Sequence, residues 1–461
     1  MSVKSFPPRA RAVLLTGATG FLGKVVLADL VRHREVLGLS AIYVLIRPKK
    51  GRTAAERFNE QLLTSEAFRE FEPGWHRDVV AVPGDVARPL LGLEADMLAR
   101  LKRELTHIVH CAASVDFNLP LKEALQANVR STLEVQSLAE QCQSLPHLLS
   151  VSTAYVQPHR EGVLQQTLQP LPEGTGGAEA LLAAIDAGQL DEAQALALCG
   201  HPNTYTFTKC LAEHLLLARR ARVPVTLLRP SIISVAQQFP HPGWIDSSAA
   251  LAGFVLCLAA GYLRVVSGDR RAQLDVVPVD QVASMIRQHA FDVAPEAGSA
   301  IVHAVAGRPR NLPLDRFAEL AVEYFKRHPQ QRSVQLKAFD RHTRWRELQH
   351  WWYHLLPLRL AGRWARLTRN PIVGRQAARL EKVLESVFRS FQYFTHRTYQ
   401  FELSPHAAFD MPRDQYIRLV CEGTRRHLLH KLQPQAARSA PGGVPAHRVA
   451  NSVSSSDDAS R

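Results

Sequence analysis

Cysteine is scarce in this sequence, and its spacing gives no sign of a metal site. The six cysteines are scattered over 461 residues, with no CxxC pair and no spacing typical of metal ligands. The first residues also lack the apolar core of a secretion signal. We therefore expect a protein of the reducing cytoplasm without a bound metal.

Long hydrophobic runs are also absent. The longest, Ala249 to Leu263, is shorter than the roughly 20 residues that cross a bilayer. We interpret this run as a buried helix. Overall, 46% of the residues are hydrophobic and 21% are charged, which excludes the composition of a disordered chain.

Acidic residues are outnumbered by basic residues, and the formal net charge is +14. Such a charge favours an anionic partner, which could be nucleic acid, an acidic membrane surface, or a phosphorylated cofactor and substrate. The arginines between Arg310 and Arg438 are not accompanied by a zinc-finger, RNP-type or basic-zipper pattern. We therefore expect no nucleic acid partner, and the other two remain open.

Short runs rich in β-branched residues alternate with longer helical patterns. This rhythm indicates βαβ units, and nearly continuous Val, Ile and Leu indicate strands covered on both faces. The predicted fold class is α/β, with a doubly wound parallel (Rossmann) sheet. The expected strands are Ala12 to Thr16, Ala41 to Ile46, Val79 to Val82, Thr106 to His110, His147 to Val151, and Val225 to Leu228.

The domain organisation follows from changes in this rhythm. We expect an N-terminal extension at 1–10 and a nucleotide-binding domain at 11–330, interrupted by an excursion from Glu161 to Gly200 beside the active site. Residues 331–432 are basic, contain several tryptophans and have a helical pattern, so they form a C-terminal, mainly helical second domain. Residues 433–461 lack periodicity and are expected to be a disordered tail.

A glycine-rich turn joins the first strand to the first helix. Glycines there allow a tight turn and let the backbone approach a pyrophosphate at the positive end of the helix. The alternative is a purely structural turn. The cofactor-binding residues expected in this turn are Thr16, Gly17, Thr19, Gly20, Phe21, Leu22 and Gly23.

Basic residues follow the second strand, where an NAD enzyme would place an acid against the ribose hydroxyl. Arg47 and Lys49 fit a 2′-phosphate, so we expect NADPH; the alternative is a solvated basic loop. After the third strand, Asp85 and Val86 are placed to meet the adenine, although a simple Asx turn would also explain the aspartate.

Small residues follow the fourth strand and leave room for the cofactor to lie flat. They are Cys111, Ala112 and Ala113, and we interpret Cys111 as a packing residue rather than a nucleophile because no partner base is evident. After the sixth strand, Pro230 and Ile232 are expected to border the nicotinamide.

Tyr205 and Lys209 stand four residues apart at the start of a helix, so both side chains share one face. A phenol with a pKa near 10 must be made more acidic to work at neutral pH, and we expect Lys209 and a cationic nicotinamide to do this. At the end of the fifth strand, a hydroxyl can join Tyr205 in stabilising a substrate oxyanion. Thr153 is our choice for this hydroxyl and Ser152 is the alternative.

With these segments in order, the chain resembles the fatty acyl-CoA reductase family, the alcohol-forming branch of the extended short-chain dehydrogenase/reductases. The later stretch Ser390 to Phe401 is similar to that family's C-terminal helical domain, whereas Gln157 and Pro158 depart from its usual Asn-Gly. The resemblance is carried by TGATGFLGKVVL (Thr16 to Leu27), LIRPKKG (Leu45 to Gly51), HCAASVDF (His110 to Phe117), STAYV (Ser152 to Val156), TYTFTKCLAEHLL (Thr204 to Leu216), LLRPSII (Leu227 to Ile233), PGWIDS (Pro242 to Ser247) and DVVPVD (Asp275 to Asp280).

The resemblance implies NADPH, a long-chain fatty acyl-CoA substrate, and Thr153, Tyr205 and Lys209 as the catalytic trio. It leaves open a reductase that stops at the aldehyde or accepts acyl carrier protein. A nucleotide-sugar epimerase or dehydratase of the same fold and a regulator that senses NADPH are rivals, the latter disfavoured because Tyr205 and Lys209 are both present. The run Ala249 to Leu263 either lines an acyl tunnel or is a plain core helix.

Between Arg344 and Arg369, arginines alternate with tryptophans and leucines, as in segments that rest on an anionic membrane surface. The alternative is that the tryptophans form the core of the second domain and the arginines its solvated rim. Peripheral membrane contact is therefore one of two hypotheses for this segment. Within it, Pro357 is expected to break any single long helix.

Overall fold

The computed structural model describes residues 10–293, 298–329, 334–336, 338–340, 343–371, 373–375, 377–378, 380–381, 384, 393–404 and 410–432. The expected N-terminal extension, apart from residue 10, and the expected tail at 433–461 lie outside these residues. So do residues 390–392 at the start of the C-terminal stretch described above.

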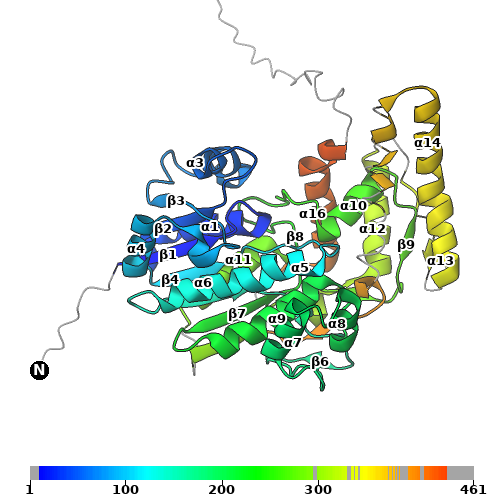
Figure 1. The fold of residues 1–461 in the computed structure, drawn as a ribbon. Coiled ribbons are helices and arrows are strands. Elements are labelled where there is room, and N and C mark those ends of the chain that lie inside the picture. The colour runs from blue at the N-terminus through cyan, green and yellow to red at the C-terminus, as the bar shows by residue number, and fades with distance from the viewer. Residues whose placement is uncertain are drawn as a thin grey trace, which may run out of the picture.

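A seven-stranded parallel sheet forms the centre of the molecule (Figure 1). Its order is β12-β7-β5-β4-β1-β2-β3, and every neighbouring pair is parallel. The strands are β1 (Arg11–Thr16), β2 (Leu39–Ile46), β3 (Val79–Pro83), β4 (His107–His110), β5 (His147–Val151), β7 (Val225–Pro230) and β12 (Ser299–Ala304).

All six strands expected from the sequence are confirmed. The seventh, β12, was not predicted. It lies at the edge of the sheet and its first three residues are only half-buried. Its sequence SAIVHA also lacks the continuous apolar run that marks a central strand, so the sequence pattern did not predict it.

Helices cover both faces of the sheet, which confirms the doubly wound fold. Alternate residues of β1 point to opposite faces: Val13 and Leu15 share a core with α1 and α11, whereas Leu14 shares another with α4 and α6. These surrounding helices are α1 (Phe21–Arg32), α2 (Arg34–Leu37), α3 (Ala54–Phe58), α4 (Ala95–Glu104), α5 (Leu121–Ala124), α6 (Ser131–Glu140), α9 (Thr204–Arg219) and α11 (Val279–Phe291).

The excursion from Glu161 to Gly200 packs against α9. It contains β6 (Val163–Leu164), α7 (Ala178–Asp186) and α8 (Glu192–Cys199), and its apolar residues share a core with Phe207 and Leu211 of α9. Strand β6 pairs in parallel with β15 (Gln400–Phe401). A segment late in the sequence is thus attached to the excursion, whose helices pack against the helix that carries Tyr205 and Lys209.

A further core joins the elements after β7 to the C-terminal helices. Helix α10 lies inside it, with Leu251, Phe254 and Leu258 at most 4% exposed, so the expectation of a buried helix is confirmed. The elements of this part are β8 (Ile232–Ser234), α10 (Ala250–Ala259), β9 (Val265–Ser267), β10 (Gln273–Leu274), β11 (Val276–Pro278), β13 (Leu312–Pro313), α12 (Leu314–Arg327), β14 (Ala338–Asp340) and α16 (Arg413–His427).

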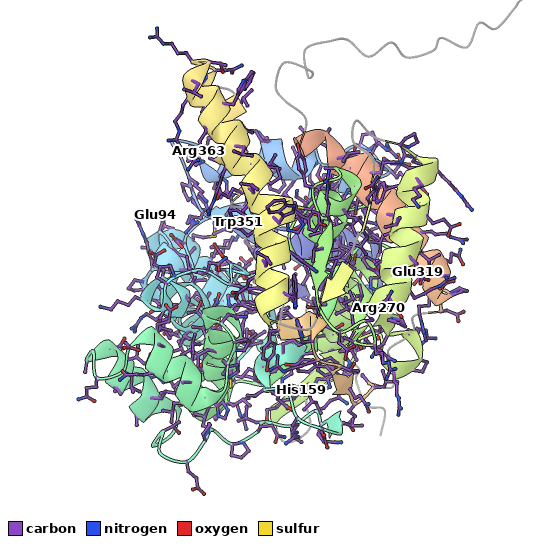
Figure 2. The ribbon with its side chains drawn as sticks, turned by 90° about the vertical axis from the view of Figure 1, so that its right-hand side faces the viewer. Glu94, His159, Arg270, Glu319, Trp351 and Arg363 are labelled. Carbon is purple, nitrogen blue, oxygen red and sulfur yellow. The ribbon has the colours of Figure 1, made fainter. Side chains whose placement is uncertain are left out.

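A long helix lies at one side of the molecule, and its C-terminal part projects beyond the body (Figures 1 and 2). It runs from α13 (Thr343–His350) through the π-helical η8 (Trp351–Leu355) to α14 (Leu356–Leu367). Our expectation that Pro357 breaks this helix is wrong. The Leu356 amide donates to the Trp351 carbonyl, five residues back, and such a π-turn just before a proline widens the helix where its ring needs room.

Short 3₁₀ and π segments complete the described fold. They are η1 (Asn59–Leu63), η2 (Glu66–Phe68), η3 (Pro89–Gly92), η4 (Leu125–Arg130), η5 (Ala154–Val156), η7 (Arg308–Arg310) and η9 (Leu429–Leu432). Within the described ranges, no helix combines the length and the apolar character needed to pass through a bilayer.

Candidate active site

The glycine turn between β1 and α1 has the geometry of a phosphate-binding loop. Gly17 has a φ of +75°, and a Cβ there would lie 2.7 Å from the Ala112 amide nitrogen. Helix α1 begins after Gly20, which offers no side-chain cap, and its first turn contains no acid. The positive N-terminus of α1 therefore suits an anion, and the donor set fits a dinucleotide pyrophosphate.

Thr16 joins this turn to the loop after β4. Its Oγ1 accepts a hydrogen bond from the Ala112 amide at 3.2 Å and lies 2.8 Å from His110 Nδ1. Burial lowers the pKa of His110 to about 3, so this ring is neutral. Burial also raises the pKa of the Cys111 thiol to about 12, which agrees with a packing role and not with a nucleophile.

The predicted basic loop lies after β2. The Arg47 side chain is 52% exposed, and its Nη1 lies 3.8 Å from Asp85 Oδ2. Lys49 is exposed, and its backbone bridges to Arg52. The structure thus brings Arg47 and Asp85 together at the end of the sheet where an adenosine ribose would lie.

Arg57 is a cation of this region that the sequence analysis missed. Its Nη1 donates to the Arg47 carbonyl, and burial together with the Arg47 charge lowers the pKa of its guanidinium. Thr53 caps α3 in a reciprocal capping box with Glu56. That Thr-x-x-Glu signature could have located the start of α3, and with it Arg57.

Asp85 makes the Asx turn that we had kept as the alternative. Its Oδ1 accepts a hydrogen bond from the Ala87 amide at 3.1 Å, while Val86 is half-buried beside it. The turn leaves only Oδ2 directed toward Arg47. A contact between this loop and an adenine stays a prediction.

Thr153, Tyr205 and Lys209 come together as predicted from their motifs. Helix α9 is capped by Asn203, whose Oδ1 accepts a hydrogen bond from the Thr206 amide at 2.9 Å. The Thr153 side chain interacts with the Tyr205 phenol and offsets part of the rise in its pKa that burial causes. Lys209 is 4% exposed, and its Nζ donates to the Val151 carbonyl at 2.8 Å.

Between the two hydroxyl candidates, the contacts favour Thr153. Ser152 is buried, and its Oγ has no hydrogen-bond partner within the described part of the chain. Thr153 Oγ1, by contrast, contacts Tyr205 and lies 3.5 Å from the Pro230 carbonyl. Thr153 is therefore the better placed hydroxyl for the predicted oxyanion-binding pair with Tyr205, and this role stays a prediction.

The acidity of Tyr205 differs from our expectation. Desolvation raises its pKa to about 12, and the Thr153 hydrogen bond opposes this only in part. The expected lowering by Lys209 is wrong for the chain by itself, because the Lys209 ammonium is directed to the Val151 carbonyl. Burial also lowers the pKa of Lys209 to about 8, against the attraction of Glu213.

An aromatic wall that the sequence analysis missed stands beside Tyr205. The Phe117 ring centroid lies 5.5 Å from that of Tyr205 and 5.9 Å from that of Phe394. Phe394 in turn contacts Tyr155 at 4.7 Å. A residue close to the C-terminus is thus within two ring contacts of the catalytic tyrosine, which no local spacing could reveal.

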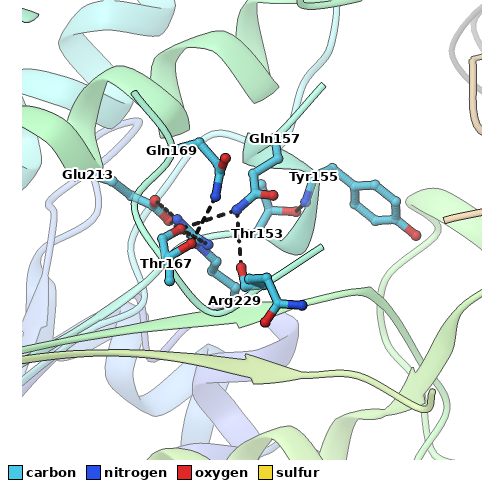
Figure 3. A network of polar contacts seen from close by, with 8 residues as sticks. Thr153, Tyr155, Gln157, Thr167, Gln169, Glu213 and Arg229 are labelled. Atoms are coloured by element: carbon cyan, nitrogen blue, oxygen red, sulfur yellow. Dashed lines mark hydrogen bonds and ion pairs between the residues drawn. The ribbon is translucent and has the colours of Figure 1, made fainter. Parts of the chain in front are cut away.

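A buried ion pair joins α9 to the end of β7 (Figure 3). Arg229 donates to Glu213 at 2.6 and 3.0 Å, and the two side chains are 1% and 3% exposed. Arg229 also donates to the Thr167 carbonyl at 3.1 Å, and Gln157 donates to the same carbonyl at 3.2 Å. Gln157 therefore holds the loop of the excursion in place.

Asn128 is another buried polar residue that was missed. It lies in η4 and is 1% exposed. Its Oδ1 accepts from the Ser114 amide at 2.9 Å, and its Nδ2 donates to Thr208 Oγ1 at 3.0 Å. Asn128 thereby fixes α9 against the loop after β4.

The segment after β8 covers the start of α1. Trp244 is 2% exposed and stacks on Phe21 with ring centroids 5.5 Å apart, and Lys24 forms an ion pair with Asp246. Pro230 and Ile232, expected to border the nicotinamide, are both buried at the neighbouring strand end. The PGWIDS motif thus packs on the cofactor-binding loop.

Comparisons with known proteins match this geometry. The profile of the family described as "Male sterility protein" matches residues 15–286. Fatty acyl-CoA reductase 1 of Gallus gallus is 31% identical over 460 residues, covering 91% of this chain and 85% of the relative. The Homo sapiens protein of that name is 30% identical with the same coverage.

Solved structures show the same fold. The terminal R domain of the myxalamid PKS-NRPS pathway superposes with a TM-score of 0.63 at 24% identity, covering 93% of this chain and 94% of that domain. The reductase domain of a nonribosomal peptide synthetase from Mycobacterium tuberculosis gives 0.59 at 20% identity, covering 93% of both chains. A UDP-N-acetylglucosamine 4-epimerase from Methanobrevibacter ruminantium gives 0.54 at 12% identity, covering 92% of this chain and 99% of the epimerase.

Proposed function

This chain belongs to the fatty acyl-CoA reductase family and is an oxidoreductase, and from this premise we propose that it reduces long-chain fatty acyl-CoA to fatty alcohol with NADPH through an aldehyde. The observation that carries the proposal is the meeting of three side chains at the ends of parallel strands. Thr153 at the end of β5 interacts with Tyr205, and Lys209, one turn further along α9, donates to the Val151 carbonyl of β5.

The cofactor is held by the residues already described at the edge of the sheet. The N-terminus of α1 would hold the pyrophosphate, the loop from Cys111 to Ala113 would border the flat part of the dinucleotide, and Pro230 and Ile232 would border the nicotinamide. When bound, the cofactor supplies a hydride to the substrate carbonyl carbon in each of two rounds.

The 2′-phosphate of NADPH is recognised by cations after β2. Arg47 is the primary contact and Arg57 the second, because the Arg57 guanidinium already touches the Arg47 carbonyl. Lys49 is exposed on the same loop and adds a charge. Guanidinium groups bind phosphate in a bidentate, charge-assisted manner.

Thr153 and Tyr205 stabilise charge on the reacting oxygen. In the first round both hydroxyls donate to the thioester oxygen as it becomes an oxyanion, and collapse expels the CoA thiolate and leaves an aldehyde. In the second round Tyr205 gives its phenolic proton to the aldehyde oxygen, completing the alcohol. Lys209, whose ammonium donates to the Val151 carbonyl in the chain by itself, would tune the phenol and grip the ribose once the cofactor is bound.

A long acyl chain needs apolar surroundings, because each buried CH₂ contributes about 0.8 kcal/mol. Phe117, Phe394 and Tyr155 offer such a surface next to Tyr205. Helix α10 is packed on all sides within the core that it shares with α12 and α16. These contacts favour the aromatic wall over α10 as the start of the acyl site.

The stoichiometry of the reaction tests the proposal. Purified protein is incubated with NADPH and palmitoyl-CoA, and the cofactor consumed is compared with the thiol released. Two cofactors per thiol are expected for alcohol formation. One per thiol with accumulated aldehyde would favour the aldehyde-forming alternative, and reduction only of acyl chains on carrier protein would replace the proposed donor.

We also propose that the long helix from α13 to α14 rests on an anionic membrane surface, where such substrates partition. Arg359, Arg363 and Arg366 are exposed along α14, and Figure 2 shows Arg363 on the part of the helix that extends beyond the body. Arg344 and Arg346 have side chains outside the described set. The exposed apolar side chains of the helix are Trp345, Leu348, Trp351, Trp352, Leu360, Trp364 and Leu367, between 39% and 84% exposed.

This exposure argues against the reading in which these tryptophans form a core. Apolar side chains of this size rarely face water together unless they meet a partner. Trp and Leu beside Arg is the composition of helices that lie in the interfacial zone of a bilayer.

All six cysteines are free thiols, which supports the further proposal that the protein works in a reducing compartment such as the cytoplasm.

A further inference from the structure

Three side chains that the proposed reaction does not use meet at the end of α16. Glu66 begins η2, His241 follows β8, and His427 is the last residue of α16. Each offers one ligand atom, and these atoms all lie within 4.8 Å of one another. His427 Nδ1 is 3.0 Å from Glu66 Oε2, and the two imidazole ring centroids are 5.4 Å apart.

The two imidazoles have spare coordinating nitrogens. The Nε2 atoms of His241 and His427 are buried and have no hydrogen-bond partner within the described residues. The His427 side chain is only 10% exposed. Buried polar atoms are normally satisfied, so two orphaned nitrogens in one place call for a partner.

The surroundings favour a cation as that partner. The C-terminal end of α16 carries the negative end of its dipole at His427, and Glu66 adds a carboxylate. The two arginines that precede His427 in α16 have partners outside the cluster, since Arg426 pairs with Glu422 at 2.6 Å and Arg425 donates to the Tyr324 hydroxyl at 3.2 Å.

We propose that Glu66, His241 and His427 bind a zinc ion that fastens the C-terminal helix α16 to the nucleotide-binding part of the chain. Two imidazoles and one carboxylate are zinc ligands, whereas calcium and magnesium prefer oxygen alone. Ligand bonds of about 2.0–2.2 Å require the donor atoms to approach to about 3.4 Å. Glu66 already contacts His427 and is 55% exposed, so its carboxylate can shift toward an ion, and water would complete the fourth position.

The site links distant parts of the sequence. Glu66 follows α3, the helix that carries Arg57, and α16 shares a core with α10 and α12. A metal here therefore fixes the C-terminal helix against the region that binds the adenosine end of the cofactor. No spacing rule could predict it, because the three ligands are separated by much of the chain.

Metal binding by the full untagged chain tests this site. The protein is stripped with a chelator and titrated with Zn²⁺ by calorimetry and with Co²⁺ by visible absorption, which reports coordination directly. We expect one ion per chain, cobalt d–d bands of a four-coordinate site, and a Tm higher by several degrees at excess Zn²⁺.

Matched variants separate this site from other histidines. His241→Ala and His427→Ala should each lose at least tenfold in Zn²⁺ affinity and lose the cobalt bands, whereas His328→Ala, at the exposed end of α12, keeps both. Glu66→Gln changes an exposed residue without touching the core, so it weakens binding in a chain that still folds. Absence of stoichiometric binding in the parent chain, or equal binding by Glu66→Gln, His241→Ala and His328→Ala, would overturn the proposal.

Discussion

The catalytic centre and the long helix from α13 to α14 depart from ordinary packing in opposite directions. At the centre, Lys209 is 4% exposed although burial disfavours its charge. On the helix, Trp352 and Trp364 are 57% and 58% exposed although water disfavours their rings. Packing alone explains neither arrangement, and we take each as the mark of a binding partner.

The two regions also use arginine differently. Arg229 is 1% exposed and makes two hydrogen bonds to Glu213, behind the strand end that leads to Pro230. Arg359 of α14 is 51% exposed and makes one contact, at 2.8 Å, to Glu381. The first arginine is held in a buried pair, whereas the second forms an exposed pair that water and salt can screen.

The largest effect is expected from removing the catalytic phenol. Tyr205→Phe should lower kcat on the order of 10²–10⁴-fold, because it removes the proton donor to the substrate oxygen. The Kd for NADPH, measured by fluorescence, should stay unchanged. The control is Tyr324→Phe in α12. The Tyr324 hydroxyl accepts a hydrogen bond from Arg425 of α16 and has no part in the proposed reaction, so this variant should keep normal turnover with palmitoyl-CoA. Near-normal turnover of Tyr205→Phe would show that the trio is wrongly assigned.

Breaking the buried ion pair is expected to cost stability. Arg229→Met leaves the Glu213 carboxylate buried without its partner, which should lower the free energy of unfolding by about 3–5 kcal/mol. Arg359→Ala breaks an exposed pair and should change it by less than about 1 kcal/mol. Urea denaturation measures both.

A double variant sharpens this comparison. Arg229→Met combined with Glu213→Leu removes both charges and should recover much of the lost stability. If Arg229→Met were no more destabilising than Arg359→Ala, the contrast between an arginine in a buried pair and one in an exposed pair would not hold.

The cofactor preference gives a smaller effect. Arg47→Ala should weaken NADPH binding roughly 10–100-fold, the size of one or two lost charge-assisted contacts, and leave NADH binding unchanged. Arg52→Ala alters the same loop at a residue paired with Glu60, so it should change NADPH binding much less. Equal losses for both cofactors with Arg47→Ala would exclude a contact to the 2′-phosphate.

Sequence patterns predicted the features that depend on local spacing. The glycine turn, the six central strands and the pair of Tyr205 with Lys209 each lie within one turn, strand or helix, so neighbouring residues determine them. Thr153 could be placed because parallel strands end at the same edge of a sheet. The fold class followed from the same periodicity.

Features made by distant segments could not be predicted in this way. Phe394 reaches the catalytic tyrosine through Phe117, and Glu213 meets Arg229 across two elements. The composition between 344 and 369 suited either a core or a surface, and only tertiary packing decides which side chains face water. The π-turn before Pro357 kept the helix continuous where the proline rule alone predicted a break.

The smallest expected effect concerns a single exposed arginine of the long helix. One basic residue near an anionic lipid surface contributes about 1 kcal/mol, so Arg363→Ala should weaken binding to vesicles containing phosphatidylserine about fivefold. Binding to pure phosphatidylcholine should not change, and Arg222→Ala, an exposed arginine before β7, should behave as the parent chain. Co-sedimentation measures vesicle binding by the parent chain and by both variants. The difference in binding between the parent chain and Arg363→Ala should shrink as salt screens the surface charge. Binding that ignores the anionic lipid content, or that survives replacement of Arg359, Arg363 and Arg366 by Glu, would reject the membrane surface as the partner of these tryptophans.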